Sequence, residues 1–270
     1  MLSKLPRYLW FVFLGGLGHM VIAVVAYIVD VLSALAFVLV SAVRPSYWPR
    51  STRTVLMRQI LFAGVQDVAF IGLLGMMLGV FVVELEGRVP SMAGHSLLSA
   101  RAAQLVYRDV APLLVNLVVI ARSGSAILAL LSYMVVNGEV KVLDAQGLDP
   151  FEYILLPRVV GLVVSVCALT VVFSCAFSLS AYVYGCVTST DYVHPVTYVV
   201  FSLKSLSFGD LLSGLMKCVL PASVTAVICC RDGLGVKADY PEIPKTVARG
   251  VARCILGLFA IVLLLSLLGQ

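Results

Sequence analysis

Long apolar stretches dominate this chain and decide what it can fold into. A membrane-spanning helix needs about 20 mostly apolar residues. Stretches of roughly that length or longer occur at 9–43, 55–83, 105–136, 159–187, 211–230 and 254–268, and the last extends back toward Val247. Inside a bilayer, an isolated segment satisfies its own backbone hydrogen bonds only as a helix. The sequence therefore predicts an all-α integral membrane protein.

Composition supports this class. Hydrophobic residues make up 61% of the chain and charged residues 12%, whereas about a quarter of the residues of a soluble domain are charged. The net charge of +5 is spread between apolar stretches, which indicates orientation and contact with lipid headgroups and argues against nucleic acid as a partner.

Orientation follows from where the basic residues lie. Most of the 19 Lys and Arg residues fall before residue 59, between 138 and 158, or between 231 and 253, and such segments normally face the cytoplasm. Basic residues stand on both sides of the stretch 9–43, so charge does not decide whether it crosses. We favour an interfacial or elbow helix in 1–54 and a five-span transmembrane domain in 55–270, with Gln270 facing outward.

The second certain span carries charges that a bilayer disfavours. Arg108 and Asp109 stand near its start, and Pro112 disturbs the helix after them. These residues predict a headgroup or gating site, with snorkelling to the interface as the alternative. Deeper in the span, Arg122 needs partners or water, and Gly124 permits close helix approach. Arg122 fits either a structural clamp or a contact with substrate.

The first certain span contains Gly75 and Gly79, a pair one turn apart that lets two helices approach closely. The pair fits either packing within the chain or contact with a second copy. The turn that follows, from Phe81 to Glu86, is apolar and ends in acids. It suits a groove that holds acyl chains and has polar groups at its mouth.

A short charged island, 138–152, separates the second and third certain spans. It places Val140 and Leu143 near one face of a helix and Glu139, Lys141 and Asp144 elsewhere, and Asp149 before Pro150 predicts the end of that helix. The pattern predicts an amphipathic docking helix for a partner protein, with an ordinary charged loop as the alternative.

Catalysis finds little support in the sequence. No G-x-x-x-x-G-K-[ST] motif is present, and no polar segment is long enough for an ATPase, so any ATP hydrolysis is expected on another chain. The seven cysteines form no C-x-x-C pair and do not cluster with the three histidines. We expect no metal site, no cofactor and no enzymatic activity on this chain.

Several motifs in order resemble the MlaE (YrbE-like) family of ABC transporter permeases. Arg108-Asp-Val-Ala-Pro112 is similar to the family's R-E-L-G-P, and Ala121-Arg-Ser-Gly-Ser-Ala126 to its G-R-A-G-S-A. Gly147-Leu-Asp-Pro150 and Leu156-Pro-Arg158 are similar to its A-V-D-P and S-P-R. The resemblance runs from about residue 18 onward, and each motif gains weight from its place in the series.

The resemblance implies an interfacial helix plus five transmembrane helices, assembled as a homodimer in a bacterial inner membrane with the C-terminus toward the periplasm. A lipid groove between the copies would be lined by Leu78, Phe81, Val82 and Leu85, near Arg108 and Asp109. The island would be the coupling helix that seats in an ATPase subunit, which carries the ATP and Mg. Its contact residues would be Glu139, Val140, Leu143, Asp144 and Leu148.

By the same resemblance, the chain is a permease subunit that moves phospholipid or another lipid between the inner membrane and an MCE-domain protein. A non-transporting scaffold that anchors an ATPase or MCE protein is the alternative. A secondary transporter comes third, with Asp67 and Lys217 as weak candidate sites. The chain departs from the family at Leu130, where a glutamate is usual, and at Asp109, which is shorter than the family's glutamate.

Overall fold

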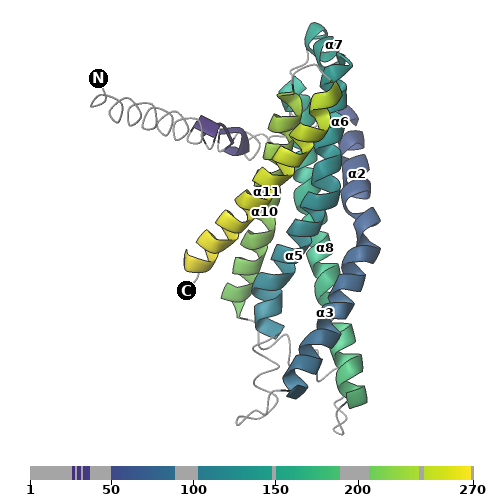
Figure 1. Ribbon diagram of the computed structural model, residues 1–270, viewed down its shortest axis with the longest axis vertical. Coiled ribbons are helices and arrows are strands. Elements are labelled where there is room, and N and C mark those ends of the chain that lie inside the picture. Colours follow the sequence, from purple (N-terminus) through teal and green to yellow (C-terminus); the bar gives the residue numbers. More distant parts are fainter. Residues whose placement is uncertain are drawn as a thin grey trace, which may run out of the picture.

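Long helices running side by side build the computed structural model of this protein (Figure 1). The structure describes residues 26–27, 29–31, 33–36, 50–88, 103–147, 150–188, 207–236 and 240–268, and within these ranges it contains no strand. The elements are α2 (Arg50–Ala63), η2 (Val65–Asp67), α3 (Val68–Arg88), η3 (Val106–Val110), α5 (Ala111–Val119), η4 (Ile120–Gly124), α6 (Ser125–Val136), α7 (Glu139–Ala145), α8 (Pro150–Thr188), α10 (Phe208–Leu234), η5 (Tyr240–Glu242) and α11 (Ile243–Leu268).

Five helical segments are long and apolar enough to cross a membrane, which confirms the predicted all-α membrane fold and its five spans after the first stretch. They are Leu56–Leu85, Ala103–Val136, Ile154–Thr188, Phe208–Leu234 and Tyr240–Leu268. The predicted interfacial helix in 1–54 lies mostly outside the described residues. Short helical pieces containing Tyr27 and Asp30 are described, and they contact the end of α10 and, through Arg253, α11.

Two helices begin earlier than the apolar pattern predicts. We expected the third certain span from residue 159, but α8 starts at Pro150, because proline fits the first turn of a helix, where its missing N–H is not needed. Pro157 lies inside α8 and Pro221 inside α10, and neither ends its helix. Likewise, α11 starts at Ile243, slightly before Val247, toward which we expected the last stretch to extend.

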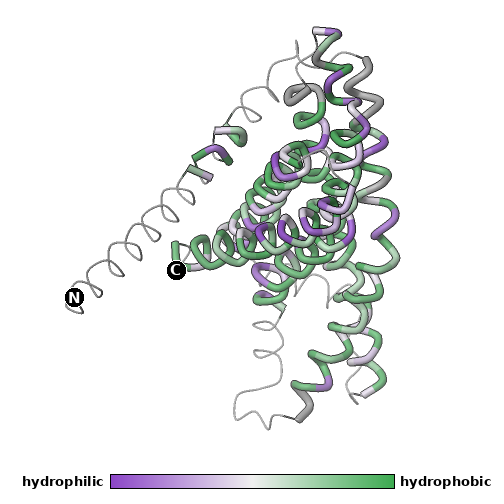
Figure 2. The backbone as a smooth tube through the Cα atoms, turned by 45° about the horizontal axis from the view of Figure 1, so that its top comes forward, coloured by the Kyte–Doolittle hydropathy of each residue, from purple (hydrophilic) through white to green (hydrophobic). Residues whose placement is uncertain are grey.

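The core of the bundle lies along α8, which packs against α2, α3, α5 and α10. Fully buried side chains such as Leu155, Leu162 and Phe173 line the length of α8. By contrast, α3 and α11 lie at the edges of the bundle and expose large apolar side chains, among them Phe81 at 61% and Leu263 at 65%. Apolar residues also run along both edge helices in Figure 2. Such surfaces suit lipid or a second protein chain, and they would not be stable in water.

The glycine pair of the first span faces α8. A Cβ atom on Gly75 would lie 2.7 Å from the carbonyl oxygen of Phe173, and one on Gly79 would lie 2.6 Å from that of Phe177. Both distances are too short for any side chain, so the two backbones can only approach this closely because the residues are glycines. Gly72, a turn earlier, has open space around its missing side chain.

This packing predicts that Gly75→Val destabilises the protein while Gly72→Val does not. Forcing two helix backbones apart typically costs about 1–3 kcal/mol, so the Gly75→Val protein should lose its folded fraction at a clearly lower temperature. Heating the purified protein in detergent and measuring the monodisperse fraction by size-exclusion chromatography checks this. Equal thermal stability of the two variants would contradict the assigned contact.

Candidate functional site

Two ion pairs join η3 to α10 in the half of the bundle away from α7. Arg108 Nη1 lies 3.1 Å from Asp210 Oδ1, and Lys217 Nζ pairs with Asp109 Oδ1. The Lys217 side chain is only 1% exposed and the Asp210 side chain 7%, whereas Arg108 is 25% and Asp109 32% exposed. Each pair therefore has a buried member on α10 and a more accessible member on η3.

The local backbone explains how adjacent residues reach two different partners. Successive helical residues point about 100° apart, and η3 is a five-residue π-helix, a turn type that often marks functional positions. Asp210 and Lys217 are separated by seven residues, about two helical turns. Between them, Gly214 faces η3, and a Cβ there would lie 3.4 Å from the carbonyl oxygen of Tyr107, about an ordinary contact distance.

The carboxylate of Asp210 is held by three donors. Besides Arg108, it accepts hydrogen bonds from Gln104 Nε2 at 2.8 Å and from the Ser207 backbone N–H at 3.1 Å. The contact with Ser207 is half of a capping box at the start of α10. The start of α10 is thus fixed to the start of the second span.

Buried polar contacts continue deeper into the second span. Pro112 is buried in the first turn of α5, and Asn116 Nδ2 donates to the Pro112 carbonyl at 2.8 Å and to the Lys217 carbonyl at 3.3 Å. A third ion pair follows in η4, where Arg122 Nη1 lies 2.7 Å from Asp67 Oδ1. Because Asp67 belongs to the first span, Arg122 links the first two spans.

The Arg122–Asp67 pair lies where both helices are irregular. Asp67 is 2% exposed and ends η2, the short break between α2 and α3, while Arg122 is 49% exposed on the π-helix η4. The Ser123 hydroxyl lies 3.4 Å from Asp67 Oδ2, and the guanidinium carbon of Arg122 lies 5.8 Å from the centre of the Phe70 ring. The last residue of η4 is Gly124. A Cβ atom built on it would lie 3.5 Å from Cys229 Sγ.

The side chains predicted to line a groove fall into two groups. Leu78 and Val82 are half-buried against the core, whereas Phe81 and Leu85 of α3 are 61% and 53% exposed. Near them, the Tyr184 hydroxyl donates to Glu84 Oε2 at 2.7 Å, which ties the end of α3 to α8. Arg108 and Asp109 instead pair with α10. The end of α3 is therefore fixed by α8, whereas Arg108 and Asp109 are fixed by α10.

The charged island forms a short helix, α7, between two glycine turns. Gly138 and Gly147 have φ values of +77° and +74°, a region that favours glycine. The helix ends at Ala145, earlier than the predicted stop, and Pro150 begins α8 instead of ending α7. Glu139 is exposed, while Val140 and Leu143 are half-buried. The side chain of Asp144 and all of Leu148 lie outside the described residues.

Sequence reasoning missed Asp210 and Gln104 and gave Lys217 only a minor role. The available signal was an aspartate and a lysine seven residues apart in an otherwise apolar span. Among the residues that the structure describes, no three His, Cys, Asp or Glu side chains lie close enough together to hold a metal ion.

Comparison with known proteins gives one consistent result. Residues 56–268 match the family model described as Permease MlaE. The chain is 24% identical to a probable ABC transporter permease protein of Rickettsia typhi over 76% of this chain and 78% of that one. It is 25% identical to the intermembrane phospholipid transport system permease protein MlaE of Haemophilus influenzae, over 75% and 77%. It is also 26% identical to the chloroplastic protein TRIGALACTOSYLDIACYLGLYCEROL 1 of Arabidopsis thaliana, over 56% and 43%.

The ion pair between Lys217 and Asp109 predicts a strongly non-additive mutant cycle. Asp109→Asn leaves the Lys217 ammonium, which is only 1% exposed, without its ionic partner, and removing one member of a buried pair typically costs about 3–5 kcal/mol. Adding Lys217→Met should recover a large part of that loss, because no uncompensated charge remains. Thermal unfolding of the two single variants and the double variant, in the same detergent, measures the coupling. Strictly additive losses would refute the pairing.

Proposed function

The chain belongs to the MlaE family of permeases, and on that premise we propose that it is the membrane subunit of an ABC transporter that moves phospholipid. The partners would be a second copy of this chain, a separate ATPase chain that binds ATP and Mg, and a periplasmic MCE-type carrier. The Haemophilus influenzae relative, named for intermembrane phospholipid transport, supports this substrate class. We further propose an inner-membrane location with α7 facing the cytoplasm and the C-terminus facing the periplasm.

The proposal rests mainly on the two ion pairs between η3 and α10. Charged residues within a span are costly and usually serve transport or binding. Arg108 is the accessible cation of this network, since its side chain is 25% exposed while its partner Asp210 is 7% exposed. A lipid phosphate would compete with Asp210 for the guanidinium, which forms strong bidentate hydrogen bonds with phosphate.

The open face of α3 would supply the apolar part of the site. Phe81 and Leu85 are more than half exposed, and Leu73 and Met77 continue this exposed surface along the helix. In a dimer, two such faces would form the walls of a groove for acyl chains, with Glu84 near one end. The tight packing of Gly75 and Gly79 against α8 keeps the opposite face of α3 fixed.

Coupling to ATP hydrolysis would run through α7. A short helix between two positive-φ glycines can move as a unit, and its half-buried Leu143 packs against the core of the bundle. Glu139 and Asp144 would contact the ATPase. Residues 1–54 would lie at the cytoplasmic interface as an elbow helix and 55–270 would form the permease domain.

A secondary transporter fits less well, because both of its candidate residues already have ionic partners. Asp67 pairs with Arg122 and Lys217 pairs with Asp109, whereas an ion site in such a transporter lies open in a broken helix. A non-transporting scaffold would keep the ATPase contact without lipid in the groove, so separate measurements of lipid and ATPase binding distinguish it.

Lipid contact at α3 is testable by photo-crosslinking. A photoreactive amino acid in place of Phe81 should capture phospholipid more efficiently than one in place of Val171, which is similarly exposed on α8 and belongs to neither proposed lipid site. Mass spectrometry of the crosslinked protein from native membranes gives the ratio. Equal labelling at the two positions would mean that α3 faces bulk lipid, and the groove assignment would fail.

The coupling role of α7 predicts that charge reversal releases the ATPase. Glu139→Arg combined with Asp144→Arg should greatly reduce the amount of Walker-motif ATPase that co-purifies with the chain, because two acidic contacts become repulsive. Glu242→Arg serves as the control. It reverses the charge of one acidic residue in η5, at the same end of the bundle but outside α7. Full retention of the ATPase by the double variant, with α7 still folded, would rule out this contact.

A further inference from the structure

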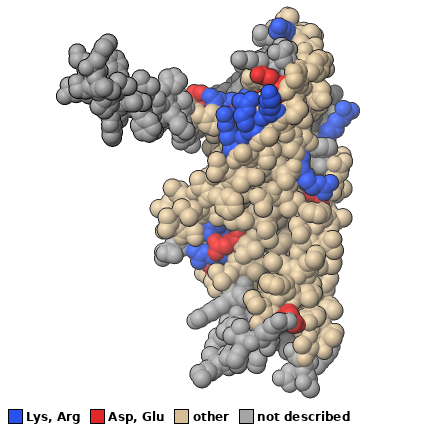
Figure 3. Space-filling view, in the orientation of Figure 1, with Lys and Arg blue, Asp and Glu red and all other residues tan. Residues whose placement is uncertain are grey.

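Four basic side chains gather at the α7 end of the bundle, on the side of α10 and α11. Lys245, Arg249 and Arg253 stand four residues apart on α11 and so share one face of the helix. Arg231 comes from the last turn of α10, which packs against α11. Most of the basic atoms in this view of the surface form one patch there (Figure 3). This cluster, Arg231, Lys245, Arg249 and Arg253, is separate from α7 and from the η3–α10 ion pairs.

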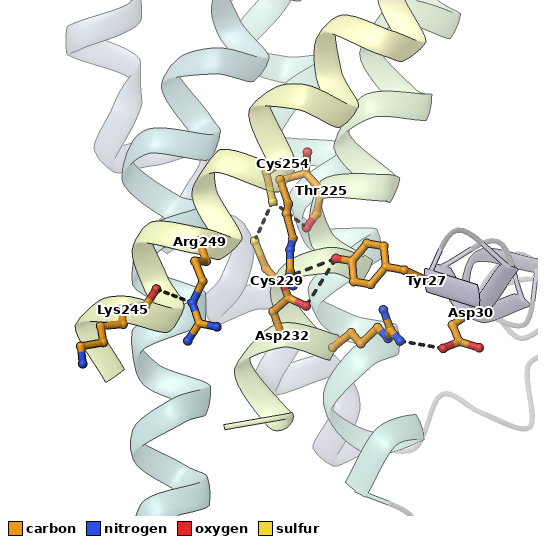
Figure 4. Close-up of polar contacts among 10 residues, drawn as sticks. Tyr27, Asp30, Thr225, Cys229, Asp232, Lys245, Arg249 and Cys254 are labelled. Carbon is orange, nitrogen blue, oxygen red and sulfur yellow. Dashed lines mark hydrogen bonds and ion pairs between the residues drawn. The ribbon is translucent and has the colours of Figure 1, made fainter. Parts of the chain in front are cut away.

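Tyr27 holds two of these arginines in place. Its ring centre lies 4.2 Å from the guanidinium carbon of Arg231 and 5.1 Å from that of Arg253. The hydroxyl of Tyr27 donates to Asp232 Oδ1 at 3.3 Å, and Figure 4 shows the ring reaching toward that carboxylate. Burial and the nearby Asp232 charge raise the pKa of Tyr27 to about 12. The phenol is therefore neutral and cancels no positive charge.

The charge of the cluster is only partly balanced. Asp30 pairs with Arg231 at 2.6 Å and Asp232 pairs with Arg253 at 2.9 Å. Lys245 and Arg249 are exposed and form no ion pair within the described part of the chain, although Arg249 Nε donates to the Lys245 carbonyl at 3.2 Å. Two positive charges thus remain available to an anion.

Below the cations, the same face of α11 becomes apolar. Leu256, Leu263 and Leu267 follow Arg249 at helical spacing and are 71%, 65% and 68% exposed. A cationic end followed by an exposed apolar stripe complements a molecule with a phosphate and long acyl chains. Clusters of basic residues at the cytoplasmic end of a span are a known physical basis for binding anionic lipids.

We propose that this cluster and the apolar stripe of α11 form a binding site for an anionic phospholipid in the leaflet at the α7 end. The site lies on α11, so it is distinct from the α3 face proposed for transported lipid. Its phosphate would contact Arg249 and Lys245, with Arg253 and Arg231 completing the basic wall.

The test is lipid binding by the purified full chain in neutral detergent. Native mass spectrometry during titration with dioleoyl phosphatidylglycerol should show a bound lipid that dioleoyl phosphatidylcholine does not replace. The variant with both Lys245→Gln and Arg249→Gln should bind the anionic lipid about twenty-five-fold more weakly, a factor of about five for each charge removed. Transport is not part of the readout, so failure here is separable from failure of the proposed function.

The matched control removes two exposed charges elsewhere at the same end, Arg58→Gln with Lys141→Gln. That variant should bind phosphatidylglycerol like the unmodified protein, and an equal loss would mean that only overall charge matters, which would overturn the site. A second arm adds inorganic phosphate at millimolar concentration. If phosphate alone displaces the lipid, the cluster is a site for free anions, and the lipid proposal is wrong. An unchanged affinity in the Lys245→Gln and Arg249→Gln variant would also overturn it.

Discussion

An unpaired charge is costly inside a bilayer because no water is there to solvate it, and the arrangement of this protein depends on three ion pairs that join different helices. Asp67 and Arg122 join the first span to the second, and the two η3 pairs join the second span to α10. All three pairs include a residue of a π-helical segment, η3 or η4. The second span is thus the element through which its neighbours are held in register.

Such pairs fix geometry more than they add stability. Replacing a buried ion pair with well-packed apolar side chains is often neutral or stabilising, while breaking one is costly. A pair with an exposed cation, such as Arg108 with Asp210, has a further property. A phosphate that competed for Arg108 would leave the Asp210 carboxylate with its hydrogen bonds from Gln104 and the Ser207 backbone N–H. These two donors lower the cost of opening the ion pair, because the buried carboxylate would not be left without partners.

The spans were predictable from sequence because each is long and apolar, and their number follows directly from the stretches after residue 54. The starts of the helices were less predictable from the sequence. Pro150 begins α8, whereas a proline after an aspartate predicted the end of the preceding helix. The partners of Arg108 and Asp109 could not be derived, because Asp210 and Lys217 are about a hundred residues away and only helix packing brings them together. The same holds for Gly75, whose sequence motif does not tell which helix it contacts.

The contacts of α6 show how α7 is connected to the bundle. Leu130, where the resemblance to the family led us to expect a glutamate, is 53% exposed on α6. The opposite side of α6 packs very closely on its neighbours. A Cβ on Gly233 of α10 would lie 2.7 Å from Leu131 Cβ, and one on Gly250 of α11 would lie 2.8 Å from Leu128 Cδ1. At the end of α6, the Tyr240 hydroxyl donates to Asn137 Oδ1 at 2.9 Å. Since α7 follows α6 directly, these leucine–glycine contacts connect α7 to α10 and α11, and none of them involves position 130.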